Sequence, residues 1–532
     1  MTPPMKPCSA TFLASLLAGA MPALLVATPA AASSPAPAAM VPAPATRPPP
    51  PLRDDEFHAL LGRALPLAER QDCAPLLGLL DPALPRLAGK NRNIVQMLRI
   101  QCLDQLGRGE EVAAAYREMV ASDPGDPMVR SVGVVLAASS GDYPEAGRRL
   151  ASLAEDDPAG LSTITSALVR GVAQQLTQKK DYGLRDRLFL ALARADWQPA
   201  DRPEMRDSLA QGAIEALLER KDVDEATTLL PRVQMPELLV AMATERVYQP
   251  LWGAIDARLG PHGASAIDPF VAAQLDNFSR NPDDGRAIRD AVRAFILLGR
   301  YPEAVDTAAA VSVATGMSEE AVTTVRYAAQ ALAAEGRRAD AVARLRPFAS
   351  VDFARNPALV SGVVSLAEML DEDNHEEDAL AVARDALARG GDAISPWGTS
   401  WLRRTEACAL AALGRKAEAD QVGDTLRAAA ADNQAATIEA LLCIGRDDEA
   451  ARLAIETLAT VEGTSLLADQ FQPEGAFWAS SPSRLRALWA RLLERRDVRS
   501  AFDRTARILP RTYWPAPAPR PIPRLPGDGP TT

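Results

Sequence analysis

The stretch GDYPEA, at residues 141–146, contains the signals that decide the fold of this chain. It joins two Ala/Leu-rich segments, and Pro158 follows the second segment, 17 residues after Gly141. Glycine adopts the left-handed backbone conformation that ends a helix, and Glu145 in the first turn of the next helix suits the helix dipole. Ala146 is small enough for two helices to approach closely, and the proline ends the second helix. The stretch therefore predicts a pair of antiparallel helices.

Copies of this pattern recur along the chain, with 31 to 37 residues between clear neighbours. Clear copies begin at Gly107, Gly141, Gly299, Gly336, Gly414 and Gly445. Asn374 takes the glycine position in a further copy, because asparagine is the next-best residue for a positive φ. Degenerate copies occupy residues 69–74, 221–226 and 496–501. Amphipathic pairs cannot bury their apolar faces alone, so we expect about twelve pairs to stack within residues 54–514.

The GDYPEA stretch with Pro158 resembles the tetratricopeptide-repeat (TPR) family at the turn, the second helix and the closing proline. The resemblance covers about residues 90–514 and implies an all-α, right-handed superhelical solenoid of stacked antiparallel helix pairs. The usual Trp, Gly and Tyr positions of the first helix are mostly replaced. Copies in residues 160–275 are hard to place, and residues 468–482 form an irregular insertion. A closed α/α toroid of the glycosidase type is the rival architecture.

The composition favours helix and restricts the partners. Hydrophobic residues make up 47% of the chain but aromatic residues only 5%, which disfavours a β-sandwich or barrel and the aromatic-rich toroid. The net charge is −11, so broad binding to nucleic acid or anionic membranes, which needs a basic face, is not expected.

The two ends of the chain are not expected to fold. Residues 1–32 are typical of a signal peptide, with an apolar run and a small-residue cleavage site, which predicts a periplasmic protein. Residues 33–53 form a Pro/Ala-rich linker, and residues 515–532 form a Pro-rich tail, each predicted to be a disordered spacer, a docking peptide or a tether. No later segment is apolar enough to span a bilayer, so no transmembrane span is expected after cleavage.

The chemistry of an enzyme is mostly missing from the sequence. The chain contains no HExxH, GxSxG, SxxK, P-loop, GxGxxG or CxxC motif, and its three histidines lie in different contexts. The acidic residues at 371–373 and 376–378 straddle a repeat turn and lack an ordered ligand spacing. We therefore expect no catalytic residue, no metal site and no cofactor.

Four cysteines remain beyond residue 32, and an oxidising compartment permits two bridges between them. Cys73 falls on a second helix and Cys102 on the following first helix, which makes them a candidate disulfide. Cys408 and Cys443 fall on neighbouring first helices, whose axes are expected about 8–10 Å apart, which is wide for a disulfide. For this second pair a bridge and buried free thiols both stay open.

The resemblance implies that a partner docks on first-helix side chains, at repeat positions 2, 5 and 9 when the turn residue is position 15; we call these the groove positions. The groove positions, or their equivalents in neighbouring repeats, form a row of cations with one tryptophan: Arg286, Arg289, Arg293, Arg326, Trp401 and Arg404. Such a row suits a carboxylate-rich extended peptide or an anionic glycan. The alternative is that these are ordinary solvated positions, since 52 of the 58 basic residues are arginine. Acidic residues at 368, 371 and 372 predict a change of sign along the groove.

The sequence favours a non-catalytic periplasmic scaffold that binds another envelope protein. An accessory role in polysaccharide or protein export is the first alternative, and it fits the arginine row and the Pro-rich ends. A peptidoglycan- or glycan-acting α/α enzyme is the second alternative, and it would need a catalytic carboxylate in a cleft.

Overall fold

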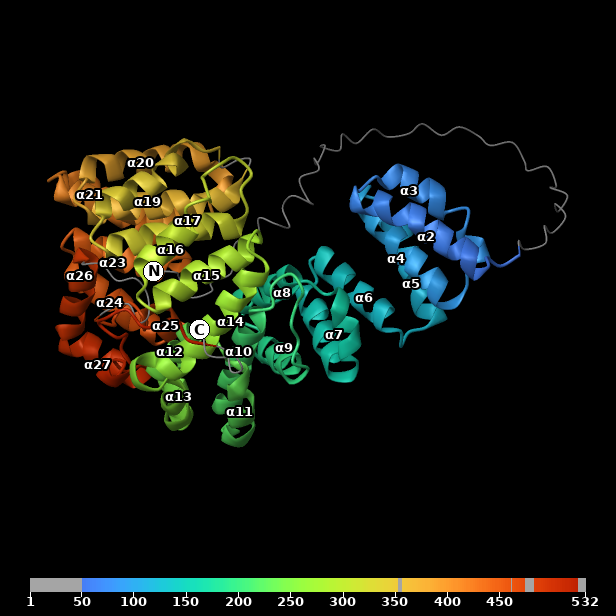
Figure 1. The fold of residues 1–532 in the computed structure, drawn as a ribbon, viewed down its shortest axis with the longest axis horizontal. Coiled ribbons are helices and arrows are strands. Elements are labelled where there is room, and N and C mark those ends of the chain that lie inside the picture. The colour runs from blue at the N-terminus through green and yellow to red at the C-terminus, as the bar shows by residue number, and fades with distance from the viewer. Residues whose placement is uncertain (1–49, 353–355, 461, 474–482, 525–532) are drawn as a thin grey trace, which may run out of the picture. The chain divides into compact units, whose positions relative to one another are not determined.

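The computed structural model describes residues 50–352, 356–460, 462–473 and 483–524, and most of these residues are helical (Figure 1). They form two compact units, which we call the N-terminal unit (residues 50–205) and the C-terminal unit (residues 206–524). Within the described ranges the one β-type pairing is an isolated bridge between Glu245 and Ala506. The predicted all-α class is confirmed. The expected signal peptide and most of the expected linker lie outside the described residues.

The N-terminal unit consists of helix pairs in chain order. The pairs are α2 (Asp54–Glu69) with α3 (Cys73–Leu80), α4 (Gly89–Gln105) with α5 (Gly109–Ser122), α6 (Pro127–Ser139) with α7 (Tyr143–Asp156), and α8 (Ser166–Gln178) with α9 (Tyr182–Arg194). Each helix packs on its pair partner, and α4 also contacts α6, which in turn contacts α8. One apolar core cluster runs through α2 to α6 and includes Phe57, Leu103 and Met119.

The C-terminal unit continues with the same alternation and one interruption. Its helices are α10 (Met205–Glu219), α11 (Val223–Leu229), α12 (Pro236–Thr244), α13 (Trp252–Leu259), α14 (Ala264–Arg280), α15 (Gly285–Leu297), α16 (Tyr301–Thr307), α17 (Glu319–Ala334), α18 (Arg338–Leu345), α19 (Val360–Glu372), α20 (Glu376–Gly390), α21 (Pro396–Ala412), α22 (Lys416–Ala428), α23 (Gln434–Cys443), α24 (Asp447–Leu458), α25 (Gly463–Leu467), α26 (Arg484–Glu494) and α27 (Arg496–Thr505). Helices α12 to α14 follow one another without a strict pair, in the part of the sequence where repeats were hard to place.

The turns have the backbone conformation that the repeat predicts. Gly141 has φ +80° and Asn374 has φ +57°, and the other five turn glycines also have positive φ. The alanine that follows each turn is buried: Ala146, Ala304, Ala341, Ala379 and Ala450 are 0% exposed. The helix pairs therefore meet where the sequence places its smallest side chain, as predicted.

Most turns also carry a local ion pair that the sequence analysis did not identify. The arginine after the turn glycine pairs with the acidic residue three positions later, as in Arg108–Glu111 at 2.7 Å and Arg446–Glu449 at 2.6 Å. A hydrogen bond from the arginine holds the pKa of each of these glutamates below its usual value. The Gly-Arg-x-x-Glu spacing thus links the end of one helix to the first turn of the next.

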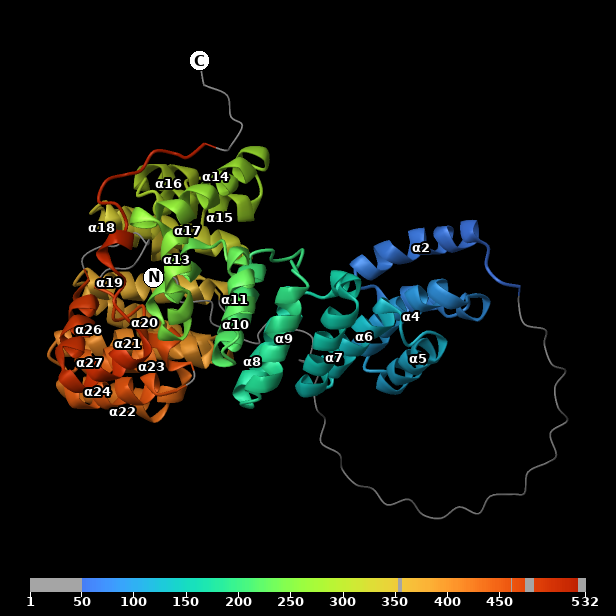
Figure 2. The same ribbon diagram turned by 90° about the horizontal axis from the view of Figure 1, so that it is seen from below.

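The C-terminal end of the chain returns to earlier helices of its own unit. We call residues 506–520 the clasp. The backbone N–H of Arg507 donates to Thr244 O at 2.7 Å, at the end of α12, and the backbone N–H of Arg520 donates to Leu298 O at 2.8 Å, at the end of α15. Figure 2 shows the chain after α27 running back along this unit toward α16 and α14. The expected Pro-rich tail at 515–532 is thus not a free spacer as far as residue 524, because its arginine satisfies a helix carbonyl that has no partner within the helix.

Candidate functional site

Arg404 of the predicted arginine row is a buried structural residue. It is 0% exposed, and its guanidinium lies 3.0 Å from Glu368, 3.6 Å from Asp371 and 3.2 Å from Glu439, measured between nearest nitrogen and oxygen atoms. It also lies over the ring of Trp401, 5.0 Å from the centroid. The positive charge is compensated inside the chain and has no surface to offer a partner.

The acidic residues predicted along the groove are compensated as well, in part by the last helix pair. Arg484, at the start of α26, pairs with Asp371, and Ser483 donates to Glu372 at 2.6 Å. Trp489, further along α26, donates its ring N–H to Glu439 at 3.0 Å. The acidic residues that predicted a change of sign along the groove therefore belong to an internal ion-pair network and do not form a surface for a partner.

Burial perturbs the carboxylates of this network. Desolvation raises the pKa of Glu439 to about 7, against the opposing effect of Arg404. Burial likewise raises the pKa of Asp371 and of Glu372. Raised carboxyl pKa values in a cleft suggest acid–base chemistry, but Asp371 is 0% and Glu439 2% exposed, so neither is presented to a substrate here.

The remaining arginines of the row are also engaged within the chain. Arg293 is 8% exposed and donates to Glu237 at 2.8 Å, with its guanidinium above Phe270. Arg289 pairs with the neighbouring Asp290 at 2.7 Å. Arg326 and Arg286 are half-buried side chains on α17 and α15, and Arg326 donates to Ser365 Oγ at 2.7 Å. Arg293 and Arg404 do not fit the predicted peptide-binding row, because each is buried against carboxylates of neighbouring helices of the same unit.

Both cysteine pairs are joined in the structure. Cys73 on α3 and Cys102 on α4 have Cα atoms 5.0 Å apart, and Cys408 on α21 and Cys443 on α23 have the same separation. The second pair was left open in the sequence because first helices were expected to lie too far apart. Ala407 on α21 and Ala440 on α23 are buried in one apolar cluster, and their small side chains allow the two helices to approach.

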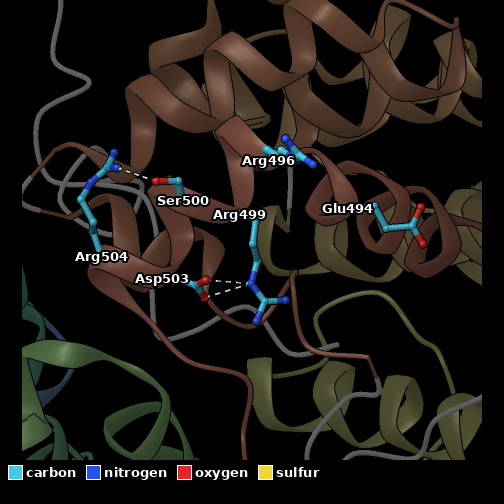
Figure 3. Close-up of a pocket in the computed structure, with 6 residues that line it drawn as sticks. All are labelled: Glu494, Arg496, Arg499, Ser500, Asp503 and Arg504. Carbon is cyan, nitrogen blue, oxygen red and sulfur yellow. Dashed lines mark hydrogen bonds and ion pairs between the residues drawn. The ribbon is translucent and has the colours of Figure 1, made fainter.

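A hollow of about 490 Å³ lies against α27 and the end of α26 (Figure 3). Its lining residues are Glu494, Arg496, Arg499, Ser500, Asp503 and Arg504. Arg499 pairs with Asp503 at 2.9 Å, and Arg504 donates to Ser500 at 3.2 Å. All six side chains are exposed, and the charges largely compensate one another, so the hollow is a surface feature of the last helix pair and not an enclosed site.

The groove positions of the N-terminal unit differ from those of the C-terminal unit. Counted from the positive-φ turn residues Gln71, Gly107 and Gly141, six of the nine groove positions on three consecutive first helices carry apolar side chains, and the other three are His58, Gln101 and Ser131. We call the six apolar residues the apolar strip: Leu61, Leu65, Ile94, Met97, Met128 and Val135. Leu65 and Val135 both occupy position 9 of their repeats, and they are 48% and 47% exposed.

The apolar strip is the functional feature that the sequence analysis missed. The same register that selected the arginines also selects Met128 and Val135 when it is counted back from Gly141, so the signal was present in the sequence. Leu61 and Leu65 were harder to find, because Gln71 replaces the turn glycine and does not mark the turn. Large exposed apolar side chains at equivalent positions of a repeat indicate an interaction surface.

Two further classes of site are not supported by the described residues. In those residues no group of three or more His, Cys, Asp or Glu side chains is placed to hold a metal ion. Among the described helices, none combines the length and the hydropathy that crossing a bilayer requires.

Comparison with known proteins finds matches among solved structures alone. No protein-family model matches the chain, and no curated protein matches it. Solved structures that match include Naa15/Naa10 bound to HypK-THB (14% identity, TM-score 0.26, covering 78% of this chain and 71% of that chain). They also include the APC/C hetero-tetramer Cut9-Hcn1 (14% identity, TM-score 0.26, covering 83% of this chain and 85% of that chain). A third match is the P58(IPK) TPR domain (15% identity, TM-score 0.19, covering 76% of this chain and 99% of that chain). At such TM-scores these matches carry no argument of their own, and it is the helix pairing that defines a TPR-like α-solenoid.

Proposed function

We propose that this protein is a non-catalytic scaffold that docks another protein on the apolar strip of its N-terminal unit. The observation that carries the proposal is the exposure of Leu65 and Val135 at equivalent repeat positions. Of the four large apolar side chains that are most exposed in the described chain, three belong to the N-terminal unit. Removing such surface from water favours association by about 25 cal/mol per Å².

The C-terminal unit supports this assignment by contrast. Its groove positions hold charged side chains that pair with one another and with α26, so a partner would have to break buried ion pairs in order to bind there. The proposal therefore gives the two units different roles. The C-terminal unit is a self-contained body, and the N-terminal unit presents the docking surface.

The experiment is a capture assay with matched surface variants of the full chain. We expect Leu65→Ser combined with Val135→Ser to lose a captured protein partner. Leu106→Ser is the control, because Leu106 is 49% exposed in the same unit but follows the end of α4, on the opposite side of the helix axis from Met97. A partner that is lost equally with the control, or retained by the double variant, would contradict the proposal.

We further propose that the protein is exported to the periplasm, as residues 1–32 suggest. The two pairs of bridged cysteines support this location, because structural disulfides persist in oxidising compartments. Mass spectrometry of the alkylated, unreduced protein should find Cys73 linked to Cys102 and Cys408 linked to Cys443. Four free thiols in protein isolated from cells would contradict the proposed location.

A further inference from the structure

We propose that the partner segment is an amphipathic helix whose apolar face is bordered on one side by lysine or arginine residues. This inference rests on the proposed function, because it names the chemistry of the segment that the apolar strip binds. It follows from three features of the strip: its helical backbone, its course across three first helices, and the charges along its two sides.

The first feature is that the strip is built from helices. Apart from the helix ends and the carbonyl that faces Pro66 in α2, the backbone groups of α2, α4 and α6 are paired within those helices. The surface therefore offers a peptide side chains but no row of free N–H and C=O groups. An extended peptide lying on apolar side chains would leave its own backbone groups unpaired, at a cost for each group that is removed from water. A helix satisfies its backbone internally, which favours a helical partner over an extended one.

The second feature is that the strip crosses three first helices. Leu61 and Leu65 lie four residues apart on α2, and Met128 and Val135 lie seven residues apart on α6, so each helix presents its apolar side chains on one face. Leu61, Ile94 and Met97 pack against the same core cluster, which makes the strip continuous with the interior. Helices α4 and α6 contact each other, and α2 and α4 both contact α3. Packed helices generally have axes about 8–10 Å apart, so a helix of three to four turns is long enough to lie across such neighbours with its own apolar face.

The third feature is that one side of the strip, toward the C-terminal ends of α2 and α4, is acidic. Glu69 follows Leu65 by one turn of α2, and Asp104 follows Met97 by two turns of α4; both are exposed. In the described part of the chain neither has an ion pair, whereas the nearby Asp81 is paired with Arg99. These two carboxylates form the acidic rim.

The opposite side of the strip carries charges of both signs. There α2 begins with the exposed Asp54 and Asp55, one turn before His58, and α4 carries the exposed Lys90. A partner helix with basic residues along one border therefore fits with that border at the acidic rim. Charge complementarity of this kind sets orientation and association rate more than affinity.

The test uses designed peptide probes and the full chain. Three 18-residue peptides share one leucine/alanine face: one has a lysine border, one has a glutamate border, and one has the lysine border with two central prolines that prevent a helix. Fluorescence anisotropy at low salt should show the lysine peptide binding roughly fivefold tighter than the glutamate peptide, as expected for two exposed ion pairs. The proline peptide should bind at least tenfold more weakly than its helical counterpart.

Variants locate the binding. A chain of net charge −11 attracts any lysine-rich peptide, so specific binding must be lost in the Leu65→Ser/Val135→Ser chain and retained in the Leu106→Ser chain. Glu69→Gln with Asp104→Asn should remove most of the preference for lysine and leave the binding of the glutamate peptide unchanged or improved. Equal binding of the lysine and glutamate peptides, or a preference that survives the double amide variant, would overturn the inference.

The two proposals can fail separately. If a natural protein docks at the strip but the probes show no preference for a basic border or for a helix, the scaffold function stands and this inference is wrong. If the probes bind as expected and no natural protein contacts the strip, the inference about the surface stands and the scaffold function fails.

Discussion

Replacing Arg507 with alanine removes the main side-chain anchor of the clasp. The guanidinium of Arg507 donates to Ala243 O at 2.6 Å and to Asp256 at 2.9 Å, and it lies 3.7 Å above the ring of Trp252. Only 21% of the side chain is exposed. The variant therefore leaves the end of α12 without its charged donor and leaves a half-buried carboxylate without its cation.

The expected cost is about 2–4 kcal/mol. Each hydrogen bond to or from a charged group contributes about 1.5–3 kcal/mol, and the contact with the tryptophan ring adds about 0.5–2 kcal/mol. The net loss is smaller than this sum, because the variant no longer has the desolvation cost of burying a guanidinium. The backbone N–H of Arg507 still reaches Thr244 O, so the clasp weakens without being removed. Arg504→Ala is the matched control, because Arg504 is exposed, donates only to Ser500 among the hydrogen bonds described, and should cost less than about 0.5 kcal/mol.

Hydrogen exchange measured by mass spectrometry on the full chain is the appropriate assay, because it reports local opening in a protein of two units. Peptides from α12 and from residues 506–520 should exchange faster in the Arg507 variant, by a factor that corresponds to the lost free energy, and should be unchanged in the control. If α12 is as well protected from exchange in the Arg507 variant as in the control, the clasp does not hold the end of this helix and the reasoning is refuted.

Three further outcomes follow from single sites. Burial, with repulsion from Glu215, raises the pKa of Glu245 to about 8, so the folded state keeps a proton that the unfolded state releases. The free energy of unfolding should therefore fall as pH rises from about 4.5 to about 8. In urea unfolding, Glu245→Gln should make this fall smaller by up to a few kcal/mol. A pH dependence in the variant equal to that of the unchanged chain would contradict this. Arg404→Met should cost about 3–5 kcal/mol by leaving buried carboxylates uncompensated, and adding Glu439→Gln should recover part of the cost in a double-mutant cycle; additive costs would contradict the pairing. Gly336→Ala, at φ +78°, should cost about 1 kcal/mol, whereas an alanine at Gly285, where no such φ is required, should be nearly neutral in thermal unfolding.

The repeat could be predicted from the sequence because its signals are local. A glycine or asparagine at the turn, an acidic first turn and a small alanine each act within a few residues, and the structure confirms the positive φ of Asn374 and the burial of Ala146. The interruption at α12 to α14 was visible only as a region where these signals fade. The Gly-Arg-x-x-Glu pairs were equally local and could have been predicted.

The candidate site was harder to predict because it depends on contacts between distant residues. A cationic groove position such as Arg404 has the same sequence appearance whether it faces water or a neighbouring carboxylate. Asp371 meets Arg484 across 113 positions of sequence, and Arg507 meets Asp256 across 251. The apolar strip, in contrast, could have been predicted from the repeat numbering, because Val135 is position 9 when Gly141 is position 15.

The most direct test of the central claim is a photo-activated crosslinker placed at position 135 of the full chain in its native cells. Crosslinkers at Leu106 and at Ala113, an exposed residue of α5, serve as controls on other faces of the same unit. The scaffold proposal predicts a discrete protein adduct at position 135 that is absent at both control positions and disappears when Leu65 is changed to serine. Adducts of equal yield at all three positions, or an adduct at 135 that survives the Leu65→Ser change, would contradict it.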